Sequence, residues 1–147
     1  METSCMNITA MGTRLVALFL FSLMSQWALA HVSAENAWVR LLPPNMMTTA
    51  AYVTLTPSHD DRLVGARSDI ATRVEIHEST MADGVMSMRP LEGVDMKDSV
   101  AVQLKPQGVH LMLIGLKRPL KEGEMIGIEL ELEQTGVQKI PFTVRKP

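Results

Sequence analysis

After residue 30 the chain alternates between short apolar runs and turn-forming residues. The runs are rich in Val, Ile, Leu and Thr, and none has the 3.6-residue periodicity of an amphipathic helix. We predict strands at 35–42, 50–56, 62–67, 72–78, 85–90, 99–104, 109–114, 124–133 and 137–145. Pro141 lies inside the last run and predicts an edge strand or a bulge there. The pattern indicates one all-β domain, an antiparallel Greek-key β-sandwich or barrel.

One segment, "TRVEIHESTMADGVMSMRPL" (72–91), is typical of a hairpin. Asp83-Gly84 is a strong signal for a two-residue type I′ turn, since both of its central residues need a positive φ. Such a turn would place Met81 opposite Met86. Because side chains alternate between the faces of a strand, two sets then separate. We expect His77, Met81, Met86 and Met88 on one face, and Val74, Ile76, Val85 and Leu91 on the core face.

The stretch "GVHLMLIGL" (108–116) sorts its side chains in the same way. Its aliphatic residues fall on one face, while His110 and Met112 fall on the other, which we expect to be wet. A methionine alone is usually core filler, and a surface histidine alone is usually just solvated. The repetition of the His/Met pairing in two strand systems favours a common ligand instead.

The first 30 residues have the features of a secretory signal peptide. Arg14 precedes the apolar run 15–24, and Ala28-Leu29-Ala30 forms a small-x-small exit. The run is shorter than the roughly 20 residues of a membrane span, although an uncleaved anchor is the alternative. We predict cleavage after Ala30, which would leave His31–Pro147 in the periplasm.

The composition narrows the chemistry of the exported domain. Cys5 is the only cysteine and would leave with the signal, so neither a disulfide nor a thiolate ligand is expected. The net charge is −2 and there is no basic block, which argues against nucleic acid as a partner. No cationic amphipathic helix is present to hold the cleaved chain on a membrane. The sequence also shows no paired carboxylates and no activated nucleophile, so we do not expect an enzyme.

Imidazole and thioether together favour one metal. Thioether sulfur is soft and binds Cu(I) well, but Zn²⁺, Ca²⁺ or Mg²⁺ poorly. A blue-copper site is excluded because it needs a cysteine sulfur. A zinc enzyme is disfavoured because no third ligand stands at a recognisable spacing.

The order His77, Met88, His110 and Met112 has the spacing H-x10-M-x21-H-x-M. With the flanking stretches "AWVRLLPPN" (37–45) and "GVHLMLIGLKRPLKEGE" (108–124), it resembles the PCuAC-type periplasmic copper chaperones. The resemblance implies a cupredoxin-like, Ig-like β-sandwich that binds one Cu(I) near its surface through these four residues. It also implies delivery of copper to the dinuclear copper centre of a haem–copper respiratory oxidase, often alongside a thioredoxin-like copper protein. The alternative is a copper-buffering or uptake protein without a dedicated oxidase partner.

Three further residues are auxiliary candidates. Met86 and Met81 share the predicted face of the ligands and could serve as spare donors or help to hand the ion over. His31 would become the first residue after cleavage and would then offer an α-amine beside its imidazole. That pair can chelate Cu(II).

Overall fold

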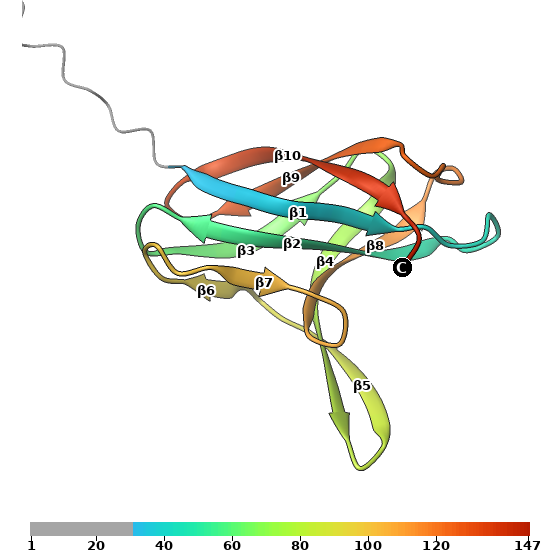
Figure 1. Ribbon diagram of the computed structural model, residues 1–147, viewed down its shortest axis with the longest axis horizontal. Helices are drawn as coiled ribbons and strands as arrows, with labels where there is room; N and C mark the ends of the chain where they lie inside the picture. The colour runs from blue at the N-terminus through green and yellow to red at the C-terminus, as the bar shows by residue number, and fades with distance from the viewer. Residues whose placement is uncertain (1–30) are drawn as a thin grey trace, which may run out of the picture.

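The computed structural model describes residues 31–147, and these residues form strands, turns and loops without a helix (Figure 1). The strands are β1 (Val32–Arg40), β2 (Thr48–Pro57), β3 (Asp61–Arg67), β4 (Ala71–Ala82), β5 (Val85–Pro90), β6 (Val94–Met96), β7 (Val102–Leu104), β8 (Val109–Leu116), β9 (Met125–Leu132) and β10 (Gly136–Arg145). The expected all-β single domain is confirmed. The predicted signal peptide lies outside the described residues. Within 31–147 we find no helix with the length and apolarity of a membrane span.

The sheet closes on itself as a barrel. Its wall runs β4-β8-β2-β1-β10-β9-β3, and a pairing of Ala66 with Val74 joins β3 back to β4. A closed ring of seven strands cannot have antiparallel neighbours throughout, because an odd number of direction changes does not return to the start. The one parallel pair is β1–β10. The expectation of a purely antiparallel arrangement is therefore wrong at this pair, and the other pairings are antiparallel.

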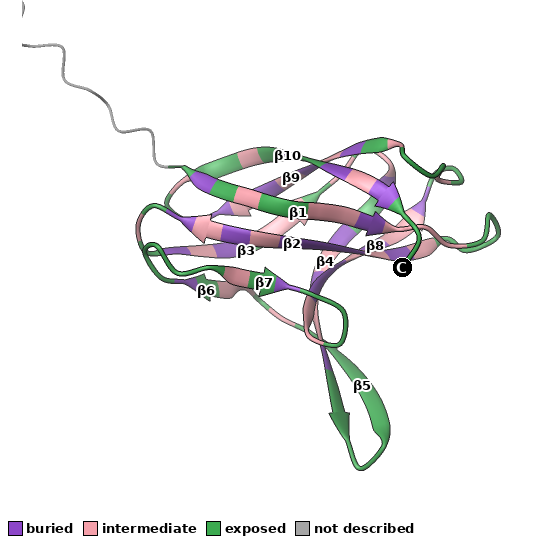
Figure 2. Cartoon of the chain, in the orientation of Figure 1, coloured by how far each residue is buried: buried purple, intermediate pink, exposed green. Residues whose placement is uncertain are grey.

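The barrel interior is the hydrophobic core. Its largest fully buried side chains come from strands all around the wall, among them Leu55, Leu63, Leu111, Leu113 and Phe142 (Figure 2). Alternation along each strand explains the pattern, since every second residue points inward. The inward assignments of 74 and 76 on β4 are confirmed.

The hairpin β4–β5 has the predicted turn and register. Asp83 and Gly84 have φ angles of 52° and 75°, and Met81 pairs with Met86. The assignment of Val85 to the core is wrong, because that residue is 67% exposed. The end of the hairpin projects beyond the barrel, where its inner face has no second layer to cover it (Figures 1 and 2).

Other differences from the sequence prediction concern short strands. Strand β6 was not predicted, and the predicted strand 99–104 forms only at its end, as β7. Pro141 lies in β10, which is not an edge strand. On its β1 side, however, β10 is paired only from Thr143 onward, so Pro141 removes no donor from that ladder.

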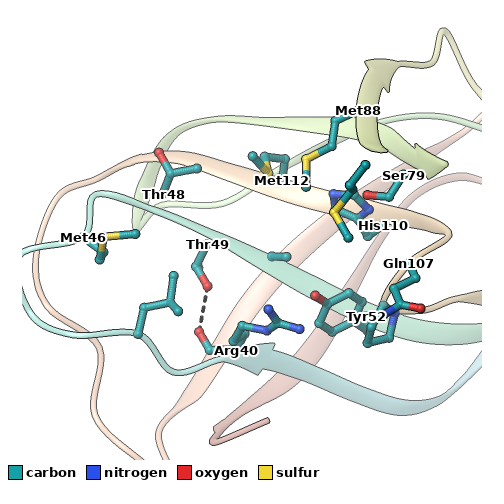
Figure 3. A pocket seen from close by; sticks show the side chains of 14 residues that line it. Arg40, Met46, Thr48, Thr49, Tyr52, Ser79, Met88, Gln107, His110 and Met112 are labelled. Carbon is teal, nitrogen blue, oxygen red and sulfur yellow. Dashed lines mark hydrogen bonds between the residues drawn. The ribbon is translucent and has the colours of Figure 1, made fainter. Parts of the chain in front are cut away.

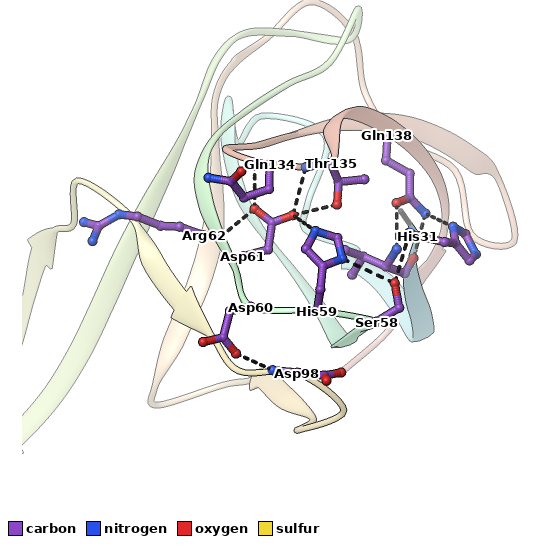
Figure 4. Close-up of polar contacts among 11 residues, drawn as sticks. His31, Ser58, His59, Asp60, Asp61, Arg62, Asp98, Gln134, Thr135 and Gln138 are labelled. Carbon is purple, nitrogen blue, oxygen red and sulfur yellow. Dashed lines mark hydrogen bonds and ion pairs between the residues drawn. The ribbon is translucent and has the colours of Figure 1, made fainter. Parts of the chain in front are cut away.

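A buried carboxylate ties the start of β3 to the β9–β10 turn. Asp61 accepts hydrogen bonds from the backbone N–H groups of Arg62, Gln134 and Thr135, and from the Thr135 hydroxyl (Figure 4). Burial alone would raise the pKa of Asp61, but these four hydrogen bonds together lower it below its ordinary value. The ionised carboxylate therefore stabilises the folded chain.

We expect Asp61→Asn to lower the free energy of unfolding by about 2 kcal/mol at pH 7, since charged hydrogen bonds are lost. Because the pKa is lower in the folded state, the contribution is complete above the unfolded pKa of about 3.9 and disappears as the pH falls through the folded pKa. Urea unfolding from pH 7 to pH 3 should show the two proteins converging. Asp95→Asn, which alters an exposed ion pair with Arg62, should change stability by less than about 0.5 kcal/mol at every pH. A constant difference between Asp61→Asn and the parent would contradict this account.

Candidate metal centre

Pairing of β4 with β8 brings two histidines face to face. His77 and His110 are register partners, and their ring centroids lie 6.2 Å apart. In the same ladder Met112 is the partner of Glu75, two residues from His77. In the neighbouring hairpin Met88 is the partner of Ser79. The four predicted ligands therefore lie on the same outer face of the wall.

This outer face is not open to water at His110, contrary to the sequence expectation. His110 is only 3% exposed. The Tyr52 ring lies 6.3 Å from its ring, between centroids, and Trp38 packs on the other side of Tyr52 at 4.6 Å. Burial raises the pKa of Tyr52, although the Arg40 guanidinium over its ring acts in the opposite direction. The Tyr52 phenol thus packs against His110, with the Trp38 indole behind it.

A cavity of about 410 Å³ opens beside His110 (Figure 3). Its wall includes the thioethers of Met86, Met88 and Met112, and the β7–β8 connection covers one side through Pro106 and Gln107. Figure 3 shows Met88 and Met112 next to His110, with the Tyr52 ring below His110. Met88 is 53% exposed, so the cavity lies at the surface on the hairpin side.

Hydrogen bonds determine which ring nitrogens have a free lone pair. His110 Nδ1 lies 3.0 Å from the Gly108 carbonyl oxygen, which can only accept, so Nδ1 carries the proton and Nε2 has the lone pair. His77 Nε2 lies 2.9 Å from a Glu75 carboxylate oxygen, so here Nε2 donates and Nδ1 has the lone pair. That Nδ1 atom is buried without a hydrogen-bond partner among the described residues. In the neutral form, the two imidazoles would therefore offer different ring nitrogens to a metal ion.

Glu75 is a site residue that sequence reasoning missed. The hydrogen bond from His77 is the main cause that lowers the pKa of Glu75, and Arg73, at 2.8 Å from the carboxylate, acts in the same direction. A carboxylate that accepts from the outer nitrogen of a ligand histidine is a common means of fixing its tautomer. The available signal was position: residues 75 and 77 share one face of a strand.

Two of the auxiliary candidates do not join this site. Met81 lies near the exposed end of the hairpin, paired with Met86. His31 precedes β1 and belongs to the opposite end of β2, near Ser58. Over residues 31–147 we find no group of three or more His, Cys, Asp or Glu side chains that could hold a metal ion.

Comparison with known sequences places the chain in a family. Residues 32–144 match the sequence model of a family described as "Putative lipoprotein LpqE-like". The chain belongs to the LpqE-like family. A relative described as "Putative lipoprotein Lxx21020", from Leifsonia xyli subsp. xyli, is 29% identical over 115 residues, which cover 78% of this chain and 69% of that protein.

Solved structures show the same fold. The copper-bound PCuAC domain from PmoF2 superposes with a TM-score of 0.67 at 20% identity, covering 82% of this chain and 97% of that domain. Apo-DR1885 from Deinococcus radiodurans is 34% identical, with a TM-score of 0.61 and 79% coverage of both chains. The Cu(I) form of DR1885 has a TM-score of 0.55 at 32% identity, covering 81% of this chain and 79% of that one. The predicted resemblance to PCuAC domains is confirmed at the level of the fold.

The two histidines should have opposite tautomers in the metal-free protein. We expect the Nε2–H form at His77 and the Nδ1–H form at His110, measured by long-range ¹H–¹⁵N NMR at a pH where both are neutral. Glu75→Ala should shift the tautomer populations of His77 and leave those of His110 unchanged. Glu129→Ala, which removes a carboxylate that Arg67 holds on another part of the barrel, should change neither. Identical spectra for His77 in the parent and Glu75→Ala would rule out this role for Glu75.

Proposed function

We propose that this protein binds one Cu(I) through His77, Met88, His110 and Met112 and passes it to another copper protein outside the cytoplasm. The observation that supports this most is the pairing of two imidazoles on one barrel face, beside a cavity lined by thioethers. In the neutral form, His77 has its lone pair on Nδ1 and His110 has its lone pair on Nε2. The other nitrogen of each ring donates to a fixed acceptor, Glu75 or the Gly108 carbonyl.

The donor set selects for the metal. Two imidazoles and two thioethers are uncharged and soft, which suits Cu(I) and is a poor match for hard cations. Glu75, the carboxylate nearest to the site along β4, is already occupied by His77 and Arg73. Residues 31–147 contain no cysteine, so oxidation to a disulfide cannot disable the site in an oxidising compartment.

Exposure of the ligands differs in a way that suits transfer. His110 is buried, and the His77 side chain is 15% exposed. Met88, by contrast, is half-exposed on a hairpin that projects from the barrel. A partner can therefore reach Met88 first and replace it, while both imidazoles still hold the ion. Transfer is a ligand exchange without a change of oxidation state, and Met86, in the same cavity wall, can act as a temporary donor.

The cellular setting follows from the relatives and from the predicted signal. The family description and the Leifsonia relative are both named as lipoproteins, which supports an extracytoplasmic location. We propose export by cleavage after Ala30. Two of the structural relatives contain bound copper. On the basis of the sequence resemblance, we propose that the protein that receives the copper is the dinuclear copper subunit of a respiratory oxidase.

A Cu(I) competition titration with a coloured chelator tests the ligand set. We expect Met88→Ala, Met112→Ala and His110→Ala each to weaken Cu(I) binding at least about tenfold, since even groups behind a ligand cost that much. The control variants are Met125→Ala on β9 and His59→Ala between β2 and β3, which remove the same donor types from outside the proposed site. Thermal unfolding checks that His110→Ala is folded. If that variant does not fold, Met88→Ala and Met112→Ala still test the proposal.

The same variants separate delivery from buffering. Mixed with the metal-free copper subunit of an oxidase, the loaded parent should transfer its ion, and Met88→Ala should change the transfer rate. Parent-like Cu(I) affinity in all three ligand variants would overturn the proposed site. Tight binding without transfer to the oxidase subunit would overturn delivery and leave a copper buffer.

A further inference from the structure

A second group of nitrogen donors lies where β1 begins and β2 ends. The backbone nitrogen of His31 lies 3.3 Å from the Ser58 hydroxyl oxygen, and His59 Nδ1 lies 3.4 Å from the same oxygen (Figure 4). One small hydroxyl group therefore bridges the amine position of residue 31 and an imidazole nitrogen. We name His31 and His59 the N-terminal histidine pair.

The fold fixes this proximity. Val32 pairs with Pro57 in the β1–β2 ladder, and Ser58 N–H donates to the His31 carbonyl oxygen at 3.2 Å. The residues on either side of the ladder end are thus held together without any metal. Ala50 on β2 is the partner of Met112. Ser58 directly follows β2 and comes eight residues after Ala50. At about 3.3 Å per residue, the pair lies roughly 26 Å from the Cu(I) face.

In each imidazole the lone pair of Nδ1 accepts a hydrogen bond that a metal ion would replace. His31 Nδ1 lies 3.3 Å from the Gln138 amide nitrogen, which donates, so this ring nitrogen has the lone pair. The Gln138 amide is itself oriented by both backbone groups of Val32. On His59, Nε2 faces the Asp61 carboxylate at 3.7 Å, and Nδ1 lies 3.4 Å from the Ser58 hydroxyl that also contacts the backbone nitrogen of His31. A carboxylate behind a ligand histidine favours metal binding at the other nitrogen.

We propose that the α-amine and Nδ1 of His31, together with Nδ1 of His59, form a Cu(II) site in the chain cleaved after Ala30. Cleavage converts the amide nitrogen beside Ser58 into an amine, which loses a proton when it binds the metal. The amine and the imidazole of one residue close a chelate ring, and His59 supplies the third nitrogen. Three nitrogen donors without sulfur favour Cu(II) over Cu(I), and Cu(II) over the other divalent ions of its row. The site shares no residue with the Cu(I) centre.

The test uses the chain expressed with residues 1–30 and recovered after export, with its first residue determined by intact mass. Cu(II) titration against a competing chelator should show one site per chain, and electron paramagnetic resonance should show nitrogen donors. We expect His59→Ala to weaken Cu(II) binding at least tenfold. A chain with one alanine added before His31 should lose binding to a similar extent. Ser58→Ala, which removes the bridging hydroxyl but no nitrogen donor, should bind like the parent.

Other variants distinguish this site from the Cu(I) centre. His110→Ala and Met112→Ala should lose Cu(I) affinity and keep the Cu(II) site, so either proposal can fail while the other stands. Loss of the Cu(II) site in His110→Ala would overturn the inference, as would parent-like Cu(II) binding in His59→Ala or in the extended chain. A mass showing that the exported chain starts at another residue would overturn it as well.

Discussion

The register of β4 against β8 is the constraint on which the site depends. Opposite residues in this ladder share a face, so the pairing of His77 with His110 places both imidazoles outside the barrel, while the pairs Ile76–Leu111 and Val74–Leu113 fill the core. A slip of β8 by one residue would turn His110 and Met112 into the aliphatic interior, expose Leu111 and Leu113, and separate His110 from His77. Core packing and the proposed metal centre therefore select the same register. The apolar residues that stabilise the barrel also position the proposed ligands.

The order of strands in the barrel also shapes the site, because it places aromatic residues of β1 and β2 beside His110. Strand β2 lies between β1 and β8, so Trp38 and Tyr52 form an aromatic layer that continues to His110. This layer buries one imidazole on what is formally the outer face. The β4–β5 hairpin extends past the barrel and carries Met88 to the rim. The proposed centre thus combines a supported imidazole side with an accessible thioether side, which suits both capture and release of a metal ion.

Local sequence signals predicted the parts of this structure that depend on local geometry. The dipeptide Asp83-Gly84 predicted the turn, and the turn type predicted the register of the hairpin. Alternation of side chains predicted which residues of β4 and β8 share a face. Properties that arise from distant strands could not be predicted in this way. The burial of His110 depends on Tyr52, and the parallel pair β1–β10 depends on the number of strands in the ring. Val85 was wrongly assigned to the core because alternation does not indicate where a hairpin extends beyond the barrel that would cover its inner face. The proximity of His31 and His59 was likewise invisible until β1 and β2 were paired.

X-ray absorption at the copper edge of the Cu(I)-loaded protein tests the central claim most directly, because it reports the number and the type of atoms bound to the metal. The account predicts one Cu(I) per chain with two nitrogen and two sulfur neighbours, and with one sulfur fewer in Met88→Ala and in Met112→Ala. A first shell of nitrogen or oxygen alone in the parent would contradict it, as would a sulfur count that neither substitution changes.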